Sequence, residues 1–140
     1  MPNYRELIGT SEKPLHLKTP PGSASYTLHV ASVQGSDTLV CTVSSTVLHY
    51  DLRCIEHLTA MLKQHGDWML LGSKDEKQDA EPGTVEFWAR ASTNPIGGWY
   101  GLKKNFRGRF AMYIPPLLEH LGHADVEHNA RNNRMRYKTS

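Results

Sequence analysis

Two adjacent prolines, Pro115 and Pro116, interrupt the strongest apolar stripe of the chain. Apolar residues recur at helical spacing over positions 106–121, and Gly122 is suited to end a helix. Proline lacks a backbone N–H and its ring clashes with the preceding helical turn. The sequence therefore predicts a helix that kinks or ends near Ile114, with a new helix starting at Pro116. The ring that follows is expected to push Ile114 out of helical geometry.

The clearest uninterrupted helix follows Asp51, whose carboxylate can cap the free N–H groups of the first turn. Apolar residues then recur every three or four positions, and Gly66 is placed to end the helix. The predicted apolar side of this helix consists of Leu52, Ile55, Leu58 and Leu62.

Upstream of this helix the chain changes character at Tyr26. Residues 1–25 contain prolines among polar residues and show neither helical nor strand periodicity, which predicts an irregular N-terminal arm. Residues 26–50 hold two β-branched and aromatic runs separated by a turn-forming segment at 34–37. We therefore expect a β-hairpin that extends a sheet or forms a homodimer contact.

Downstream, short elements alternate with loops. Residues 68–71 suit a short buried strand or an apolar turn, 73–82 form a charged loop, and Thr84 can cap a short helix. A glycine-rich loop occupies 92–105. Residues 124–128 and 134–138 flank a turn-rich segment and predict a terminal hairpin. The expected fold class is α+β.

Size and composition favour one domain spanning residues 1–140. The chain has 140 residues, 39% of them hydrophobic, which suffices for a core without disulfides or metals. It has only two cysteines, no signal-peptide pattern and no run of about 20 apolar residues. These features predict a cytoplasmic protein with free thiols and no membrane association.

Charge is distributed unevenly along the chain. Residues 1–100 contain eight Lys/Arg against eleven Asp/Glu, whereas residues 101–140 contain eight against three. A basic end indicates an anionic partner, although a solvated tail would have the same composition.

The order of elements after Asp51 is helix, short strand, helix, helix and hairpin, and it resembles a winged helix-turn-helix domain. Leu117–Gly122 running into Val126–Arg136 resembles the recognition-helix end and wing of MarR-type regulators. The resemblance covers at most residues 51–138. It implies that the third helix enters the major groove of DNA and that Arg131 and Arg134 contact phosphates or the minor groove. The proline pair departs from that pattern, and a break there would make residues 106–114 the better groove-reading segment.

Two basic groups are therefore candidates for a nucleic-acid interface. Aromatic residues flank the first, a composition that suits a phosphate backbone and stacked bases. The second lies at and beyond the tip of the predicted terminal hairpin, where Asp125 and Glu127 could instead neutralise it across the ladder. The residues are Lys103, Lys104, Arg107 and Arg109 in the first group, and Arg131, Arg134 and Arg136 in the second.

An alternative is a small-molecule-binding protein or enzyme with a pocket under the Gly97–Gly101 loop. Trp99, Tyr100 and Tyr113 would line that pocket, although Trp99 and Tyr100 could equally fill the core. The histidines lack the spacing of a zinc site, Cys41 and Cys54 suit buried thiols, and the acidic residues of 73–82 suit a solvated loop. No metal, cofactor or catalytic residue is predicted.

The hypothesis favoured by the sequence is a nucleic-acid-binding protein, specifically a DNA-binding regulator that contacts double-stranded DNA through its basic C-terminal face. The pocket protein is the first alternative. A protein-interaction module that presents the same face to an acidic partner is the second.

Overall fold

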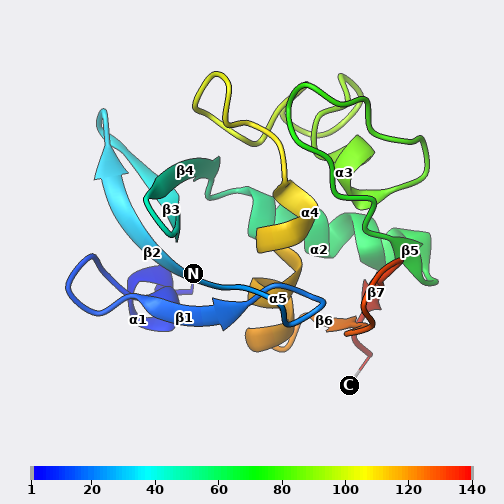
Figure 1. Cartoon of the computed structure of the whole chain (residues 1–140), viewed down its shortest axis with the longest axis horizontal. Helices are drawn as coiled ribbons and strands as arrows, with labels where there is room; N and C mark the ends of the chain where they lie inside the picture. Colours follow the sequence, from blue (N-terminus) through cyan, green and yellow to red (C-terminus); the bar gives the residue numbers. More distant parts are fainter. Residues whose placement is uncertain (1, 140) are drawn as a thin grey trace.

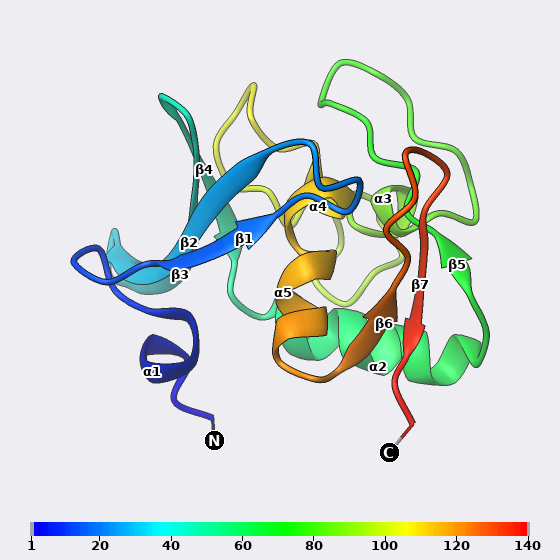
Figure 2. The same ribbon diagram turned by 60° about the horizontal axis from the view of Figure 1, so that its bottom comes forward.

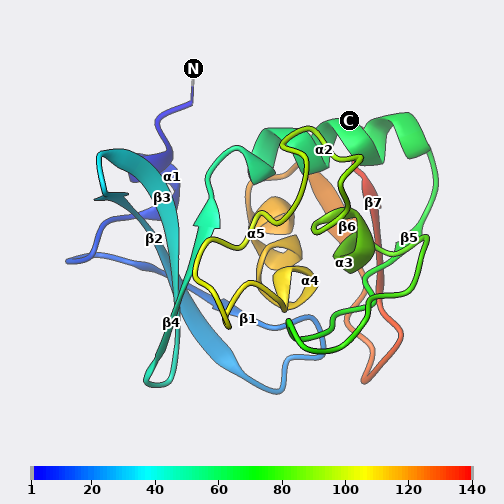
Figure 3. The same ribbon diagram turned by 90° about the horizontal axis from the view of Figure 1, so that it is seen from above.

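A computed structural model describes residues 2–139. A four-stranded antiparallel sheet forms one side of the molecule and a three-stranded antiparallel sheet forms the other (Figures 1 and 3). Two short helices, α4 (Phe110–Tyr113) and α5 (Pro115–His120), lie between the sheets. The predicted α+β class is confirmed.

The first sheet has the order β1-β2-β3-β4. Its strands are β1 (Leu15–Lys18), β2 (Ser25–Val33), β3 (Ser36–Val43) and β4 (Thr46–Asp51). The predicted turn after Val33 is present, with Gln34 and Gly35 both at positive φ. A second two-residue turn divides the run that was expected to be one strand. It was missed because its first residue, Ser44, adopts φ 55° without being Gly or Asn.

The N-terminal arm is not irregular, contrary to expectation. It contains the helix α1 (Tyr4–Ile8), whose N-cap residue Asn3 accepts a hydrogen bond from the backbone N–H of Glu6. Ile8 is buried in the core, and β1 pairs with β2 as an edge strand. Both elements are too short for a detectable period, and the contacts of Ile8 and the β1 leucines with the core stabilise them.

The long helix α2 (Cys54–His65) buries Ile55, Leu58 and Leu62 of its predicted apolar side, whereas Leu52 lies before the helix and is partly buried. Its Gly66 C-cap adopts the left-handed conformation, and the Gly66 N–H donates to the Leu62 carbonyl. The prediction that Asp51 caps this helix was wrong: Asp51 ends β4, and the N-cap position is Arg53, whose side chain makes no capping hydrogen bond. The Asp51 carboxylate instead accepts a 3.0 Å hydrogen bond from the Arg53 N–H just before the helix. Two short elements follow, β5 (Met69–Leu70) and α3 (Val85–Trp88), and the Thr84 hydroxyl caps α3 as predicted.

The proline pair breaks the expected long helix into α4 and α5, as predicted. Pro115 and Pro116 occupy the first positions of α5, where a missing N–H costs nothing. Ile114 nevertheless keeps right-handed helical angles of φ −88° and ψ −38°, so the expectation that it leaves helical geometry was wrong. Residues 106–109 are a loop, and Phe106 is exposed.

The terminal hairpin is present as β6 (Ala124–Val126) and β7 (Arg134–Tyr137), and β5 joins it to give the sheet order β5-β7-β6. Within residues 2–139, no helix combines the length and the apolar character that crossing a bilayer requires.

The elements packed around α4 and α5 leave little of either helix exposed. Edge-to-face contact joins the Tyr26 ring of β2 to the Tyr113 ring of α4, with centroids 5.0 Å apart. The first four residues of α5 are all buried. With four and six residues enclosed between two sheets, neither helix offers the exposed length that reading a DNA major groove requires.

Candidate functional site

The Gly97–Gly101 loop is held closed by its own hydrogen bonds. The Asn94 side chain donates to the carbonyls of Trp88 and Gly98, each at 2.7 Å, and accepts from the N–H groups of Ile96 and Gly98. These four bonds fix the loop as a structural turn.

Aromatic residues of this loop fill space instead of lining a pocket. Tyr100 is fully buried, stacks on Trp88 with centroids 5.0 Å apart, and lies 2.8 Å from His57 Nδ1 through its hydroxyl oxygen. Burial raises the pKa of the Tyr100 phenol. Two guanidinium groups lie over the Trp99 ring, that of Arg90 4.3 Å and that of Arg107 4.6 Å from the ring centroid. The expected pocket under this loop is therefore occupied by Tyr100 itself.

Tyr113, the third residue predicted for that pocket, lies elsewhere. It is 7% exposed and lines a separate cavity of about 290 Å³ together with Phe106 and Arg109. The structure thus does not bring Tyr113 together with Trp99 and Tyr100 around one ligand space.

Carboxylates from the 73–82 loop neutralise half of the first basic group. Arg107 Nε lies 2.6 Å from Glu76 Oε1, and the same carboxylate accepts the backbone N–H groups of Asn105 and Arg107. The side-chain hydrogen bond from Arg107 lowers the pKa of Glu76. Arg109 lies 4.0 Å from Asp75.

The two lysines of that group differ from each other. The Lys103 ammonium donates to the Val47 carbonyl at 3.1 Å and lies over the Phe106 ring. Lys104 is exposed and forms no ion pair with any residue in 2–139.

In the terminal hairpin, cross-strand carboxylates pair with two of the three arginines. Arg134 lies 2.7 Å from Glu127 and Arg136 lies 3.1 Å from Asp125. Both guanidinium groups also cover the Trp68 ring, at 5.1 and 4.4 Å. These two side chains thus pair with carboxylates across the hairpin and cover the Trp68 ring.

Arg131 is the exception among the arginines. Across residues 2–139, the other seven arginines each lie within 4.0 Å of a carboxylate, and Arg131 does not. Its side chain is exposed at the turn of the terminal hairpin, residues 127–133, which we call the hairpin turn. It is therefore the one arginine of the described chain whose charge is uncompensated.

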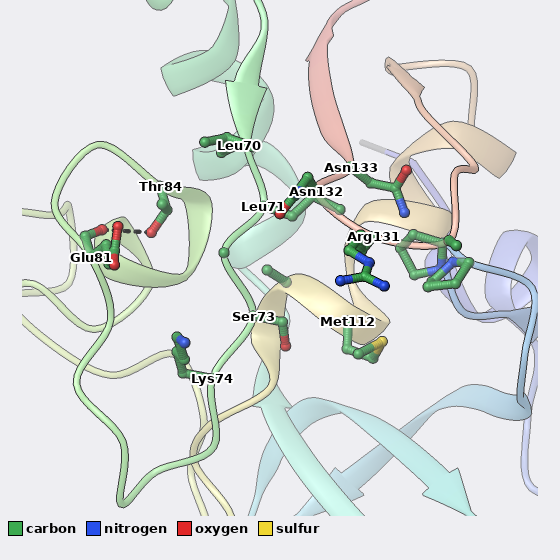
Figure 4. Close-up of a pocket in the computed structure, with 15 residues that line it drawn as sticks. Leu70, Leu71, Ser73, Lys74, Glu81, Thr84, Met112, Arg131, Asn132 and Asn133 are labelled. Carbon is green, nitrogen blue, oxygen red and sulfur yellow. Dashed lines mark hydrogen bonds between the residues drawn. The ribbon is translucent and has the colours of Figure 1, made fainter.

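Arg131 projects into a cleft of about 440 Å³, which we call the hairpin cleft (Figure 4). One wall is the hairpin turn and another is the turn after β1, which contributes Pro20 and Pro21. Leu71 and Met112 form the apolar lining between them. In Figure 4, Arg131 reaches toward Ser73 and Met112, whereas Lys74 and Glu81 lie at the opposite end.

The hairpin cleft therefore offers an uncompensated guanidinium, an apolar surface and a second polar end. An apolar cleft with a few placed polar groups is the usual form of a small-molecule site. Lys74, Glu81 and Met112 were missed from the sequence. Lys74 and Glu81 stand in a charged loop that gives no sign of facing a cleft, and Met112 belongs to an ordinary apolar stripe.

The 73–82 loop lies between the two basic groups. Lys74 lines the hairpin cleft, whereas the next two residues, Asp75 and Glu76, contact the loop at 105–109. Figure 2 shows the 101–108 loop, the 73–82 loop and the hairpin turn rising on the same side of the molecule. The loop of the first basic group and the hairpin turn therefore lie on one side of the molecule, and the 73–82 loop reaches from one to the other.

The remaining candidate side chains have separate partners. His123 Nδ1 lies 3.2 Å from the Thr59 hydroxyl, His128 contacts Pro20 and Glu119, and His120 is exposed. Cys41 and Cys54 are buried free thiols, and burial raises the pKa of both.

No curated protein and no solved structure matched the chain. One family model, described as "Family of unknown function (DUF6855)", matches residues 7–138. That match covers almost the whole chain, and the protein therefore belongs to the DUF6855 family.

Proposed function

We propose that this protein binds a small organic anion in the hairpin cleft, with Arg131 as the group that recognises the negative charge. The observation that carries the proposal is that Arg131 alone among the arginines of residues 2–139 lacks a carboxylate partner. A guanidinium presents a planar fork of N–H donors that suits a carboxylate or phosphate.

The lining indicates what the rest of such a ligand is. Leu71, Met112 and the Pro20–Pro21 pair supply apolar contact for a ring or alkyl body. Lys74 and Glu81 at the far end can donate to and accept from a polar substituent. The ligand class is therefore an amphipathic organic anion with its charged group at Arg131.

The element order from α2 to β7 supports a winged-helix-like arrangement of residues 51–138, in which the hairpin turn takes the position of the wing. In this proposal the helix that would read DNA has been enclosed by the β1–β4 sheet. The Tyr26 hydroxyl of that sheet donates a hydrogen bond to the Tyr113 carbonyl, whereas Arg131 in the hairpin turn is exposed. Ligand recognition by the turn and its cleft replaces recognition by the helix.

Naphthalene-1-sulfonate is a suitable probe because it combines an apolar ring with a permanent negative charge. Wild-type protein should bind it by calorimetry, and the amide NMR signals of Ser73, Lys74 and Asn132 should shift. Arg131→Gln should weaken binding about 10- to 100-fold, the usual range for a charge-assisted hydrogen bond. The matched control is Lys104→Gln, which removes one exposed charge outside the cleft and should leave affinity unchanged.

Either of two results would overturn the proposal: equal binding of the neutral 1-naphthalenemethanol, or equal weakening by both variants. Shifted amide signals confined to the first sheet would place binding elsewhere and would also count against the hairpin cleft.

Nucleic acid is the second candidate ligand, and the shared side of the two basic groups favours it. Arg131 and Lys104 are both exposed, and they belong to loops that rise on the same side of the molecule in Figure 2. Such binding must weaken log-linearly with rising salt, because it depends on counterion release. Anisotropy titrations of a labelled random duplex and a labelled single strand at two salt concentrations test it. An acidic peptide of equal charge distinguishes a protein partner.

A further inference from the structure

His128 joins the hairpin turn to two other parts of the molecule. Its Nδ1 lies 2.9 Å from the backbone carbonyl oxygen of Pro20, and its Nε2 lies 2.7 Å from Oε2 of Glu119 in α5. A carbonyl oxygen and a carboxylate oxygen only accept hydrogen bonds. A neutral imidazole has one N–H, which favours the Glu119 carboxylate because hydrogen bonds to ionised acceptors are stronger, whereas the imidazolium donates to both acceptors.

Pro20 belongs to a turn that is closed by its own hydrogen bonds. The Thr19 N–H donates to the Ala24 carbonyl, the Gly22 N–H donates to the Thr19 carbonyl, and the Ala24 N–H donates to the Thr19 hydroxyl. Within residues 2–139, the contact with His128 is the one hydrogen bond that connects this turn to the hairpin turn. The His128 contact is therefore the hydrogen bond through which the state of the ring can act on this turn.

The same turn forms a wall of the hairpin cleft. Pro20 and Pro21 line the cleft together with Arg131, and they also line the smaller cavity that contains His128. The position of this wall sets the width of the cleft and therefore the apolar contact available to a ligand.

We propose that His128 is a proton-operated latch on the hairpin cleft: the imidazolium ties the Pro20–Pro21 wall to the turn that carries Arg131, and the neutral ring releases it. The latch regulates the ligand site inferred above and rests on that proposed function. Ligand affinity should be highest when His128 is protonated.

Charged and titratable groups around the His128 ring affect how readily it is protonated. The Glu119 carboxylate faces Nε2 from α5 and favours the imidazolium. His120 of α5 and Lys18 of β1 line the same cavity. The positive charge of Lys18 acts against a second positive charge on His128. On the hairpin, Glu127 is already paired with Arg134. The hydrogen bonds to Glu119 and Pro20 outweigh burial and raise the pKa of His128 above its ordinary value.

The test measures naphthalene-1-sulfonate affinity by calorimetry at several pH values from acidic to mildly alkaline, where the charge of the probe is constant. Wild-type affinity should fall as pH rises through the pKa of His128. His128→Gln should remove that fall, because a glutamine side chain does not titrate. Glu119→Gln should shift it to lower pH, because the stabilising carboxylate charge is gone. His120→Gln, a neighbouring histidine, is the matched control and should keep the wild-type profile.

Linkage supplies a check that requires no variant. The factor by which protonation raises probe affinity must equal the factor by which the bound probe raises the acid affinity of His128. A tenfold change in affinity corresponds to one unit in that pKa. Titration of the His128 ring by NMR with and without the probe measures it.

Failure of the latch is distinguishable from failure of the ligand site. Backbone amide signals of Thr19, Gly22 and Ala24 should titrate together with the His128 ring even without a probe, and His128→Gln should abolish this. Amides that do not follow His128, or a pH-independent affinity in wild type, would refute the latch. If the amide signals of the turn titrate with His128 but no probe binds at any pH, the ligand site is refuted. The proton-dependent contact between His128 and Pro20 is then still supported.

Discussion

The hydroxyl of Tyr26 in β2 donates a 2.7 Å hydrogen bond to the backbone carbonyl of Tyr113 at the end of α4. That carbonyl is freed by the helix break, because the Leu117 N–H bonds Ile114 instead. A residue of the first sheet thus satisfies an acceptor that the proline pair left without an intrahelical partner, and this contact joins the sheet to the central helices.

Tyr26→Phe should therefore lower the free energy of unfolding by about 1–3 kcal/mol, since the Tyr113 carbonyl is left buried without a donor. Denaturant titration followed by fluorescence measures the change. Tyr4→Phe, which removes a hydroxyl bonded at 3.3 Å to the exposed Glu56, is the control and should have a much smaller effect. Equal losses in the two variants would show that the Tyr26 bond has no special role.

Replacement of Glu86, the carboxylate partner of Arg90, should destabilise the folded protein. Glu86 is 1% exposed, and its carboxylate accepts from Arg90 at 2.8 Å and from the Ala111 N–H at 3.0 Å. Glu86→Ala leaves the largely buried Arg90 guanidinium without its carboxylate and should cost about 3–5 kcal/mol in unfolding free energy. Glu86→Gln retains acceptors and should cost less, and Asp37→Asn, in an exposed pair with Arg5, less still. A Glu86→Ala variant as stable as wild type would contradict this account.

Two glycines of one loop should respond differently to the same substitution. A Cβ at Gly101 would clash with the backbone carbonyl of Arg107, whereas a Cβ at Gly98 would meet no atom within 4 Å. We expect Gly101→Ala to lower the thermal midpoint clearly and Gly98→Ala to change it little. The reverse order, measured by circular dichroism, would be incompatible with the close approach of these two backbone segments.

The contribution of His128 to stability should depend on pH. Because its pKa is raised in the folded state, its stabilising contribution is fully present below the unfolded-state pKa of about 6.5 and is lost as pH rises through the folded-state value. The difference in unfolding free energy between wild type and His128→Gln should therefore be largest at acidic pH and shrink on going alkaline. A difference in unfolding free energy that grows with pH would contradict this prediction.

If nucleic acid is the ligand, two arginines of the terminal hairpin should differ in importance. Arg131→Ala should reduce the slope of log affinity against log salt by about 0.7 to 0.9, the value for one lost phosphate contact. Arg134→Ala should change it less, because Glu127 already holds that guanidinium. Equal effects would show that the ion pair opens on binding. No binding at low salt would remove nucleic acid from consideration.

The sequence by itself determined the features that depend on residues close to one another in the chain. The apolar spacing before Gly66, the Thr84 cap, the break at Pro115–Pro116 and the terminal hairpin were all predictable, because helical period, capping and missing N–H groups act within a few residues. The division at Ser44 was not predictable, because its residue type does not show its positive φ.

Tertiary structure alone decided which charges are free and where the cleft lies. Arg107, Arg134 and Arg131 carry the same charge in the sequence, but the first two acquire carboxylate partners through contacts of the folded chain. Pro20, Met112 and Arg131 are far apart along the chain and line one cleft only because β1, α4 and the hairpin turn pack together. Sequence spacing carries no record of such contacts, since they depend on how distant elements bury their apolar sides against one another.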